Sequence, residues 1–241
     1  MKLPITDVHM HIVPDVDDGA VNLSMSLDML EIAYEQGVRN IFCTSHNPYE
    51  KEETEHYKAK FLMLQMTAKS RFPDLKLHMG CELLCAGEYI EDILYGLENG
   101  VFLPLGNSKY VLTELYTDTT PQEAKIIVES MLSAGWKPIL AHVERYPGLF
   151  EGNTLQELIN QGAMIQVNLY SLDEENNEDI KQSARHLVNH HFAHFVGSDS
   201  HRTNHRSPKY ENGVQYIETH CKKEYVDKLC FKNAYDLIIK E

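Results

Sequence analysis

Short β-branched segments alternate along this chain with longer segments of helical spacing, and this alternation limits the fold more than any other feature. The strand-like segments are residues 3–11, 39–45, 75–80, 110–115, 138–143, 163–168 and 193–198. Glycine stands where several of the helical stretches end, at Gly37, Gly100, Gly135 and Gly162. Strands that alternate with helices lie parallel and are joined by right-handed crossovers. We therefore expect an α/β fold, as an open sheet or a closed or nearly closed barrel, with the last 30 or so residues forming helices that cap it.

Composition narrows the class of partner. No Pro/Gly/Ser-rich linker divides the 241 residues, so we expect one domain over residues 1–241. A formal net charge of −14 is unfavourable for a nucleic-acid interface, which needs a basic face. The sequence contains no transmembrane run and no cleavable signal, and its five cysteines are irregularly spaced, as in reduced proteins. These features predict a cytoplasmic protein that neither inserts into a membrane nor binds nucleic acid.

Residue types that bind metals stand at or just after the ends of six of the seven predicted strands. In a parallel α/β barrel these ends surround the active site. The residues are His9, His11, His46, Glu82, Glu114, His142, Asp199 and His201. Only the sixth strand has no such residue and offers Asn168 instead. His9 and His11 share one face of their strand with Asp7, a candidate acceptor for an imidazole N–H, so this face can chelate a metal.

Each of these positions has an ordinary alternative explanation. A single histidine is usually a surface or core residue, and we assign that role to His56, His78, His186, His190, His191, His194, His205 and His220. The stretch "PDVDDG" (14–19) would by itself be a solvated acidic loop. The repetition of ligand types at successive strand ends favours a metal centre.

Six short motifs, in order along the chain, resemble those of the polymerase-and-histidinol-phosphatase (PHP) superfamily. They are "DVHMHIVPDVDDG" (7–19), "TSH" (44–46), "GCE" (80–82), "LTE" (112–114), "AHVERY" (141–146) and "GSDSH" (197–201). Within the superfamily the sequence looks most like the bacterial manganese-dependent protein-tyrosine phosphatases of capsule and exopolysaccharide operons. The resemblance covers residues 5 to about 208 and implies a distorted seven-stranded (β/α) barrel that holds three divalent metal ions.

The resemblance also implies roles for individual residues. It assigns His9, His11, Glu82 and Asp199 to a first metal, Glu82, Glu114 and His142 to a second, and Asp18, His46 and His201 to a third. Asp17, next to Asp18, is an alternative for the loop ligand. Arg145 and Arg206 match positions that the family uses near the phosphate, although both could be ordinary surface arginines.

The implied chemistry is phosphoester hydrolysis. The resemblance points to manganese, and mixed imidazole and carboxylate ligands suit Mn, Fe or Zn better than Mg or Ca. Three divalent ions with four ligating carboxylates would leave a positive centre that attracts an anion. Metal ions acidify a water nucleophile, and together with Arg145 they neutralise charge on the phosphoryl group. An acidic protein can therefore act on a phosphate ester.

The implied substrate is phosphotyrosine on a protein tail, such as that of a bacterial tyrosine autokinase that governs polysaccharide export. Tyrosines near the predicted mouth are either candidates to contact the substrate ring or ordinary packing residues: Tyr49, Tyr116, Tyr146 and Tyr170. No cysteine is expected to be the nucleophile, because none is followed six positions later by the arginine that a cysteine-dependent phosphatase needs.

Three alternatives remain. The first is a PHP phosphatase of a small metabolite such as histidinol phosphate, since the sequence departs from familiar members at "HNPYEKEETE" (46–55), where substrate contacts are expected. The second is a non-catalytic metal-binding regulatory protein, which predicts that a ligand is missing. The third is an amidohydrolase, which would need a further metal-binding histidine near the sixth strand, where "IQVNLY" (165–170) has none.

Overall fold

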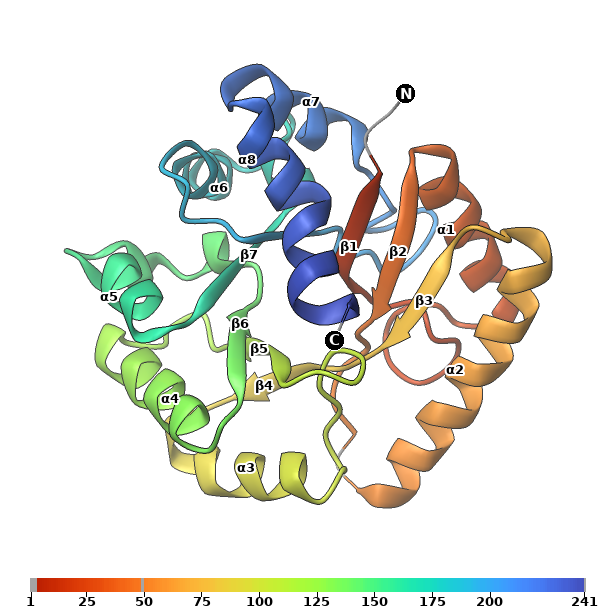
Figure 1. The fold of residues 1–241 in the computed structure, drawn as a ribbon, viewed down its shortest axis with the longest axis horizontal. Helices are drawn as coiled ribbons and strands as arrows, with labels where there is room; N and C mark the ends of the chain where they lie inside the picture. Colours follow the sequence, from red (N-terminus) through yellow and green to blue (C-terminus); the bar gives the residue numbers. More distant parts are fainter. Residues whose placement is uncertain (1–3, 49, 241) are drawn as a thin grey trace.

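The computed structural model describes residues 4–48 and 50–240, and Figure 1 shows its fold. Its strands are β1 (Ile5–Met10), β2 (Val38–Cys43), β3 (Lys76–Met79), β4 (Glu82–Cys85), β5 (Tyr110–Leu115), β6 (Lys137–Leu140), β7 (Met164–Asn168) and β8 (Phe195–Gly197). Its α-helices are α1 (Leu23–Glu35), α2 (Lys51–Arg71), α3 (Ile90–Glu98), α4 (Pro121–Ser133), α5 (Thr154–Gln161), α6 (Glu178–Asn189), α7 (Glu211–His220) and α8 (Lys223–Asp227). The predicted alternation of strands and helices is confirmed.

The strands form two parallel sheets surrounded by the helices (Figure 1). One sheet has the order β1-β2-β3 and the other β4-β5-β6-β7-β8. Backbone hydrogen bonds also link the sheets: His11 N donates to Ser200 O (2.9 Å) beyond the ends of β1 and β8, and Glu82 N donates to Ser45 O (3.0 Å) where β4 begins. The carboxyl ends of β1, β2, β4, β5 and β8 are thereby brought to one region, where the site lies.

The third predicted strand, 75–80, differs from the structure in where it ends. Glu82 was expected to follow this strand, but it is the first residue of a separate strand, β4, so the described residues form eight strands. The interruption has a local cause. Between β3 and β4, Cys81 N donates to Leu103 O (3.2 Å), while Gly106 N donates to Met79 O (2.6 Å). The loop at 103–106 therefore takes backbone hydrogen bonds that an uninterrupted strand would direct to its neighbours.

Helix ends follow the sequence signals. Gly37, Gly100, Gly135 and Gly162, expected where helices stop, all have positive φ angles, which glycine adopts without steric cost. At the amino ends, the Asn22 side chain accepts a hydrogen bond from Met25 N at the start of α1. Helix α4 begins with Thr120 as its cap and Pro121 at its first position. These caps fix where each crossover returns to the sheet.

The core has two parts. The larger lies between the strands and the surrounding helices, and the smaller packs around Val8, Phe42 and Phe195, where Ala234 and Ile238 of the C-terminal segment join it. The last residues are helical, as predicted, and they close over strand residues β1 and β8 contribute. None of the helices in the described part of the chain is long and apolar enough to cross a membrane.

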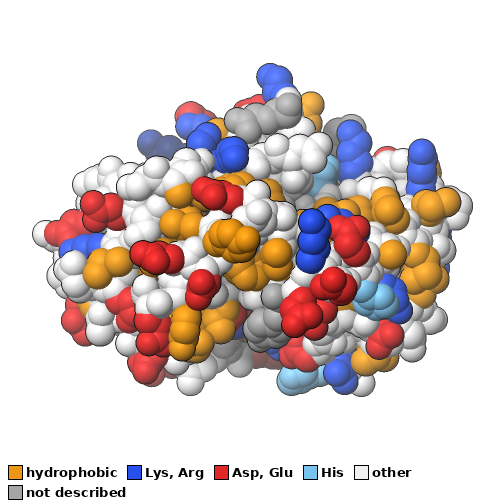
Figure 2. Space-filling view, turned by 90° about the horizontal axis from the view of Figure 1, so that it is seen from below, with side chains coloured by type: hydrophobic (Ala, Val, Ile, Leu, Met, Phe, Trp, Pro, Cys, Tyr) orange, Lys and Arg blue, Asp and Glu red, His pale blue; other side chains and the backbone are white. Residues whose placement is uncertain are grey.

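Charge is dispersed over the surface. On the face in Figure 2, acidic side chains are interspersed with hydrophobic ones, and the Lys and Arg side chains are scattered. This arrangement agrees with the expectation, from a net charge of −14, that the protein does not bind nucleic acid.

Candidate metal centre

All nine predicted metal ligands lie together. Their nitrogen and oxygen atoms form four overlapping groups, each with its atoms within 4.8 Å of one another. The groups are His11–Asp18–His46–His201, His9–His11–Asp199, His9–Glu82–His142, and His46–Glu82–Glu114. Among the described residues, no other histidine, cysteine or acid belongs to these groups, so the eight histidines given an ordinary role stay outside the centre.

Glu82 stands in the middle of the cluster. Its Oε1 lies 2.8 Å from His142 Nε2 and 3.2 Å from His9 Nε2, while its Oε2 lies 3.1 Å from His11 Nε2. The carboxylate is buried, which disfavours its charge, but the imidazoles of His9, His11 and His142 outweigh burial and hold the pKa of Glu82 well below its ordinary value. Both oxygens are thus shared between groups, as a bridging ligand requires.

Asp199 is the clearest indication that the cluster suits a cation. Its Oδ1 is buried without a hydrogen-bond partner, 3.6 Å from both His9 Nε2 and His11 Nε2. A buried carboxylate oxygen without a partner is costly unless a cation offsets its charge. Burial raises the pKa of Asp199, but His9 and Arg145 lower it further, so the group is ionised. The surrounding imidazole and carboxylate donors fit a transition metal.

Two of the ligands have unusual backbone conformations. His142 has φ +32° and Asp199 has φ +51°, in the left-handed region that residues with a Cβ seldom adopt. Hydrogen bonds hold both: His142 N donates to Gln166 Oε1 (2.8 Å), and Asp199 N donates to His9 O (2.7 Å). Strained backbone of this kind is concentrated at functional sites, where it turns side chains inward.

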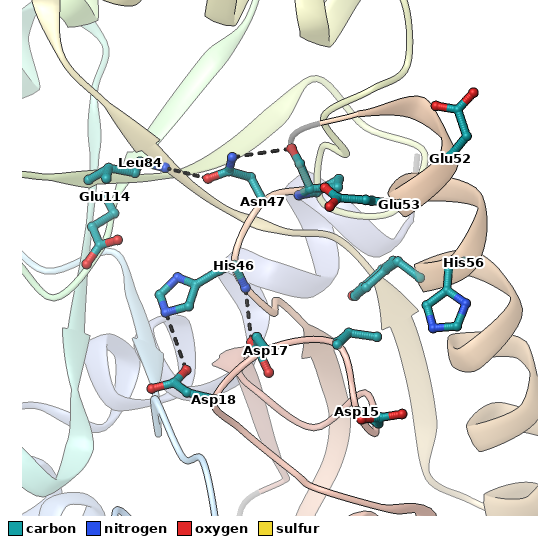
Figure 3. A pocket seen from close by; sticks show the side chains of 13 residues that line it. Asp15, Asp17, Asp18, His46, Asn47, Glu52, Glu53, His56, Leu84 and Glu114 are labelled. Atoms are coloured by element: carbon teal, nitrogen blue, oxygen red, sulfur yellow. Dashed lines mark hydrogen bonds and ion pairs between the residues drawn. The ribbon is translucent and has the colours of Figure 1, made fainter.

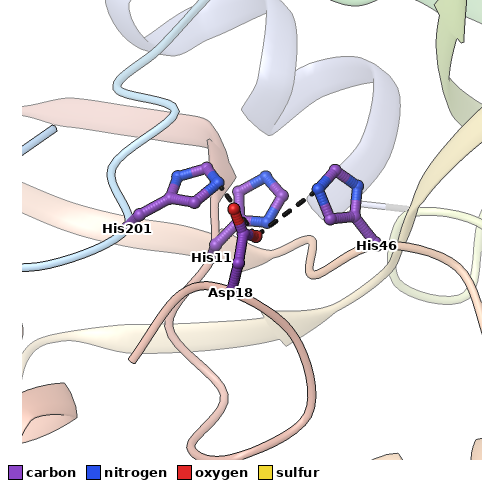
Figure 4. A group of neighbouring side chains, drawn as sticks. All are labelled: His11, Asp18, His46 and His201. Atoms are coloured by element: carbon purple, nitrogen blue, oxygen red, sulfur yellow. Dashed lines mark ion pairs between the residues drawn. The ribbon is translucent and has the colours of Figure 1, made fainter. Parts of the chain in front are cut away.

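The loop after β1 separates the roles of two adjacent aspartates. Asp17 accepts hydrogen bonds from His11 Nδ1 (2.8 Å) and from the backbone N of His46 (3.1 Å) and Gly19 (2.9 Å). Asp18 instead extends toward the imidazoles of His46 and His201, at 3.6 and 3.4 Å (Figure 4). The geometry therefore places Asp18 among the ligand atoms and Asp17 behind His11.

Glu114 enters the centre from the end of β5. Its Oε1 lies 3.6 Å from His142 Nε2. Burial, and then the nearby charge of Glu82, raise its pKa to about 7. A carboxylate that is difficult to ionise in this position is one that a bound cation would stabilise.

Both predicted arginines lie against Asp199. Arg145 Nη2 donates to Asp199 Oδ2 (2.7 Å) and to the hydroxyl oxygen of Tyr170 (2.6 Å). Arg206 also contacts Asp199 Oδ2, and its Nη1 lies 3.0 Å from His201 Nε2. Neither is an ordinary surface arginine, since each side chain is more than two-thirds covered. They give the centre a cationic edge.

The tyrosines predicted near the mouth have different surroundings. Tyr146 is buried, and its hydroxyl lies 3.1 Å from His142 Nδ1 and accepts from Leu115 N. It therefore supports His142 and does not face a substrate. Tyr116 is exposed and Tyr170 holds Arg145, whereas Tyr49 lies outside the described residues.

The supporting role expected for Asp7 is wrong in its partner. Its carboxylate accepts from the backbone N of His9 (2.9 Å) and Ser198 (3.0 Å) and from the Tyr210 hydroxyl (2.6 Å), but from no imidazole. The acceptor for His9 Nδ1 is Gln166 Oε1 (3.2 Å), on β7. Alternation along β1 places Asp7 on the correct face, but the backbone amides take both of its oxygens' best positions.

The cysteines are remote from this chemistry. Cys43, Cys81, Cys85 and Cys230 are buried, and burial raises the pKa of each thiol, to about 12 for Cys81 and Cys230. Cys221 is partly exposed and its thiol pKa is also raised by burial. None is a reactive thiolate.

A pocket of about 770 Å³ opens beside the centre (Figure 3). It lies between the 15–18 loop and the first turns of α2, and His46, Asp18 and Glu114 form its inner edge. Most of its charged lining is acidic, including Asp15 and Glu52. An extended ligand can therefore reach the ligand cluster from this side.

A cluster of imidazoles and carboxylates at the ends of parallel strands, edged by two guanidinium groups, defines a metal-dependent phosphoesterase with a PHP-type fold. The sequence profile of one family, described as capsular polysaccharide synthesis, CpsB/CapC, matches residues 5–239. The chain belongs to this family.

Individual relatives support the same assignment. The chain is 32% identical to tyrosine-protein phosphatase CpsB of Streptococcus agalactiae, over 96% of this chain and 97% of the relative. It is 33% identical to tyrosine-protein phosphatase CpsB of Streptococcus pneumoniae, over 88% of each chain. A solved structure, from a study of YwqE from Bacillus subtilis and CpsB from Streptococcus pneumoniae as metal-dependent tyrosine phosphatases, superposes with a TM-score of 0.87 at 27% identity, covering 98% of this chain and 95% of that chain.

Proposed function

We propose that this chain is a metal-dependent phosphatase that hydrolyses phosphotyrosine in proteins, as its relatives' names indicate for them. The observation that carries the proposal is the convergence of nine ligand side chains beside two arginines. The two linked sheets are, in this proposal, one distorted seven-stranded barrel in which β3 and β4 occupy a single strand position, within one domain over residues 1–241.

The ligands would hold up to three divalent ions, with manganese the first candidate and iron or zinc the others. His9, His11, Glu82 and Asp199 would hold one ion. A second would take Glu82, Glu114 and His142, and a third Asp18, His46 and His201. When bound, the ions supply Lewis acidity to water and to the phosphoryl oxygens.

The remaining side chains position the substrate. Arg145 and Arg206 stand on the same side of Asp199 and can grip phosphoryl oxygens with planar, bidentate geometry. The hydroxyl oxygen of Tyr170 orients Arg145. Because a phenolate is a good leaving group, with a conjugate-acid pKa of about 10, the reaction does not require a strong general acid.

The open pocket beside the centre favours a polypeptide over an enclosed metabolite. The family's link to capsular polysaccharide synthesis makes the tail of a bacterial tyrosine autokinase the proposed partner, in the cytoplasm. Hydrolysis of histidinol phosphate is the competing activity.

The test compares kcat/KM for a phosphotyrosine peptide with that for histidinol phosphate, both at saturating Mn²⁺. We expect the peptide to be the better substrate and Glu82→Gln to abolish both activities. More efficient turnover of histidinol phosphate would refute the substrate assignment but leave the metal centre intact.

A further inference from the structure

Strand β7 contributes no candidate metal ligand, yet two of its side chains reach the centre. Gln166 and Asn168 are fully buried and lie on the same face of the strand. A buried amide is retained at a cost unless all of its donors and acceptors are used. Every polar atom of the Gln166 and Asn168 side chains that faces the centre has a partner.

The amide oxygen of Gln166 has a defined orientation. Oε1 lies 2.8 Å from the backbone N of His142, which can only donate, so this atom must be the acceptor and not the amide nitrogen. The same oxygen lies 3.2 Å from His9 Nδ1. His9 must therefore carry its proton on Nδ1, which leaves Nε2 free to face the ligand cluster.

The orientation continues through Asn168. Gln166 Nε2 donates to Asn168 Oδ1 (2.8 Å), so the Asn168 nitrogen must be the atom that lies 3.1 Å from Asp199 Oδ2. Asp199 Oδ2 is thereby occupied, and Oδ1, which has no partner, faces the imidazoles. One continuous set of hydrogen bonds thus acts on ligands from three separate segments.

Close packing holds these two amides in place. A Cβ atom on Gly197 would lie 2.6 Å from His9 Cβ and 2.9 Å from Gln166 Nε2, so only glycine permits this approach. Behind Asn168, its backbone N donates to Glu144 Oε1 (3.1 Å). The amides have little room to rotate.

We propose that Gln166 and Asn168 are positioning residues for the metal centre: they fix the tautomer of His9, the backbone turn at His142 and the rotation of Asp199. This inference rests on the proposed metal centre but not on the identity of the substrate. Loss of such supporting hydrogen bonds typically weakens metal binding about 10- to 100-fold.

The first test uses Gln166→Met, which keeps the length and shape of the side chain but removes the amide. The control is Thr113→Val, because Thr113 is equally buried on β5 and its hydroxyl points toward Met131 in α4. Mn²⁺ is titrated into each metal-stripped full-length protein in competition with a fluorescent chelator. We expect about 10- to 100-fold weaker binding for Gln166→Met and wild-type binding for Thr113→Val.

The second test reads the His9 tautomer directly. In ¹⁵N-labelled, Zn²⁺-loaded wild-type protein, NMR should show His9 protonated on Nδ1, with the His9→Gln variant identifying the signal. In Gln166→Met this proton should exchange rapidly with water, an effect that a loss of stability alone would not produce.

The outcomes separate the two proposals. If the wild type binds neither Mn²⁺ nor Zn²⁺, the metal centre is wrong and this inference falls with it. If the wild type binds and Gln166→Met binds equally well, or if wild-type His9 is protonated on Nε2, only the inference is overturned. Should Gln166→Met fail to fold, the wild-type NMR result decides.

Discussion

Replacement of Asp17 by asparagine should destabilise the metal-free protein without removing a ligand atom. The carboxylate is 4% exposed and accepts three hydrogen bonds, from His11 Nδ1, His46 N and Gly19 N. Burial opposes its charge, but His11 outweighs burial and lowers the pKa of Asp17 from 3.8 to about 2. At ~1.4 kcal/mol for each pH unit, this difference stabilises the folded state by about 2 kcal/mol.

The sign fixes the pH window. Because the folded-state pKa lies below the unfolded value, the stabilisation is present above pH 3.8 and is lost as the pH falls through about 2. At neutral pH the full effect is therefore available, and Asp17→Asn should lose it. For a chain of this size about 2 kcal/mol corresponds to a fall in Tm of about 4–8 °C.

The matched control is Asp18→Asn, one residue away. Its side chain is 64% exposed, so the free energy of unfolding should change by less than about 0.5 kcal/mol. Its metal content should nevertheless fall, because the lost oxygen faces His46 and His201. Thermal unfolding in chelator and elemental analysis after reconstitution measure the two effects. If Asp17→Asn leaves Tm unchanged while Asp18→Asn retains all metal, the roles derived from this loop are wrong.

Further outcomes follow from the site. Chelation should abolish phosphatase activity and Mn²⁺ should restore it, whereas activity in a protein shown to be metal-free would contradict the mechanism. Iodoacetamide should leave activity unchanged, because Cys221 is the one cysteine in the described chain that is not fully buried, and a large loss would implicate a thiol. Arg145→Lys should keep its metals but lower kcat/KM at least about tenfold, and wild-type kinetics would return Arg145 to a structural role. Gly197→Ala should cost about 1–3 kcal/mol by overpacking His9, while Gly87→Ala, with its nearest contact at 3.4 Å, should be neutral in thermal unfolding.

The sequence predicted the parts of this structure that depend on local patterns. Strand and helix periodicity placed the elements within a few residues, and the glycine stop signals coincide with positive φ angles. The ligand set emerged because His9, Glu114 and Asp199 occupy equivalent positions at the ends of parallel strands. These features follow from short-range rules and from one topological principle.

The residues that sequence reasoning missed act through contacts between distant segments. Gln166 is 157 positions from His9 and Tyr146 lies within hydrogen-bonding distance of His142 only because a 3-10 turn brings it back. Asp17 and Asp18 are chemically identical and adjacent, and only the folded loop determines which faces inward. A weak signal for Gln166 existed, since a polar residue in the buried run "AMIQVN" (163–168) requires a partner.

The distribution of charge explains how a protein with net charge −14 can accept a phosphate ester. The pocket beside the centre is lined mainly by carboxylates, so its walls repel a dianion. The guanidinium groups lie on the other side of the cluster, held by Asp199 and Tyr170. A phosphoryl group is therefore attracted only at the edge where arginines and bound cations meet, and the acidic pocket favours neutral or basic residues of the peptide next to it. The same asymmetry orients the substrate, because reversing the peptide would bring its phosphate against carboxylates.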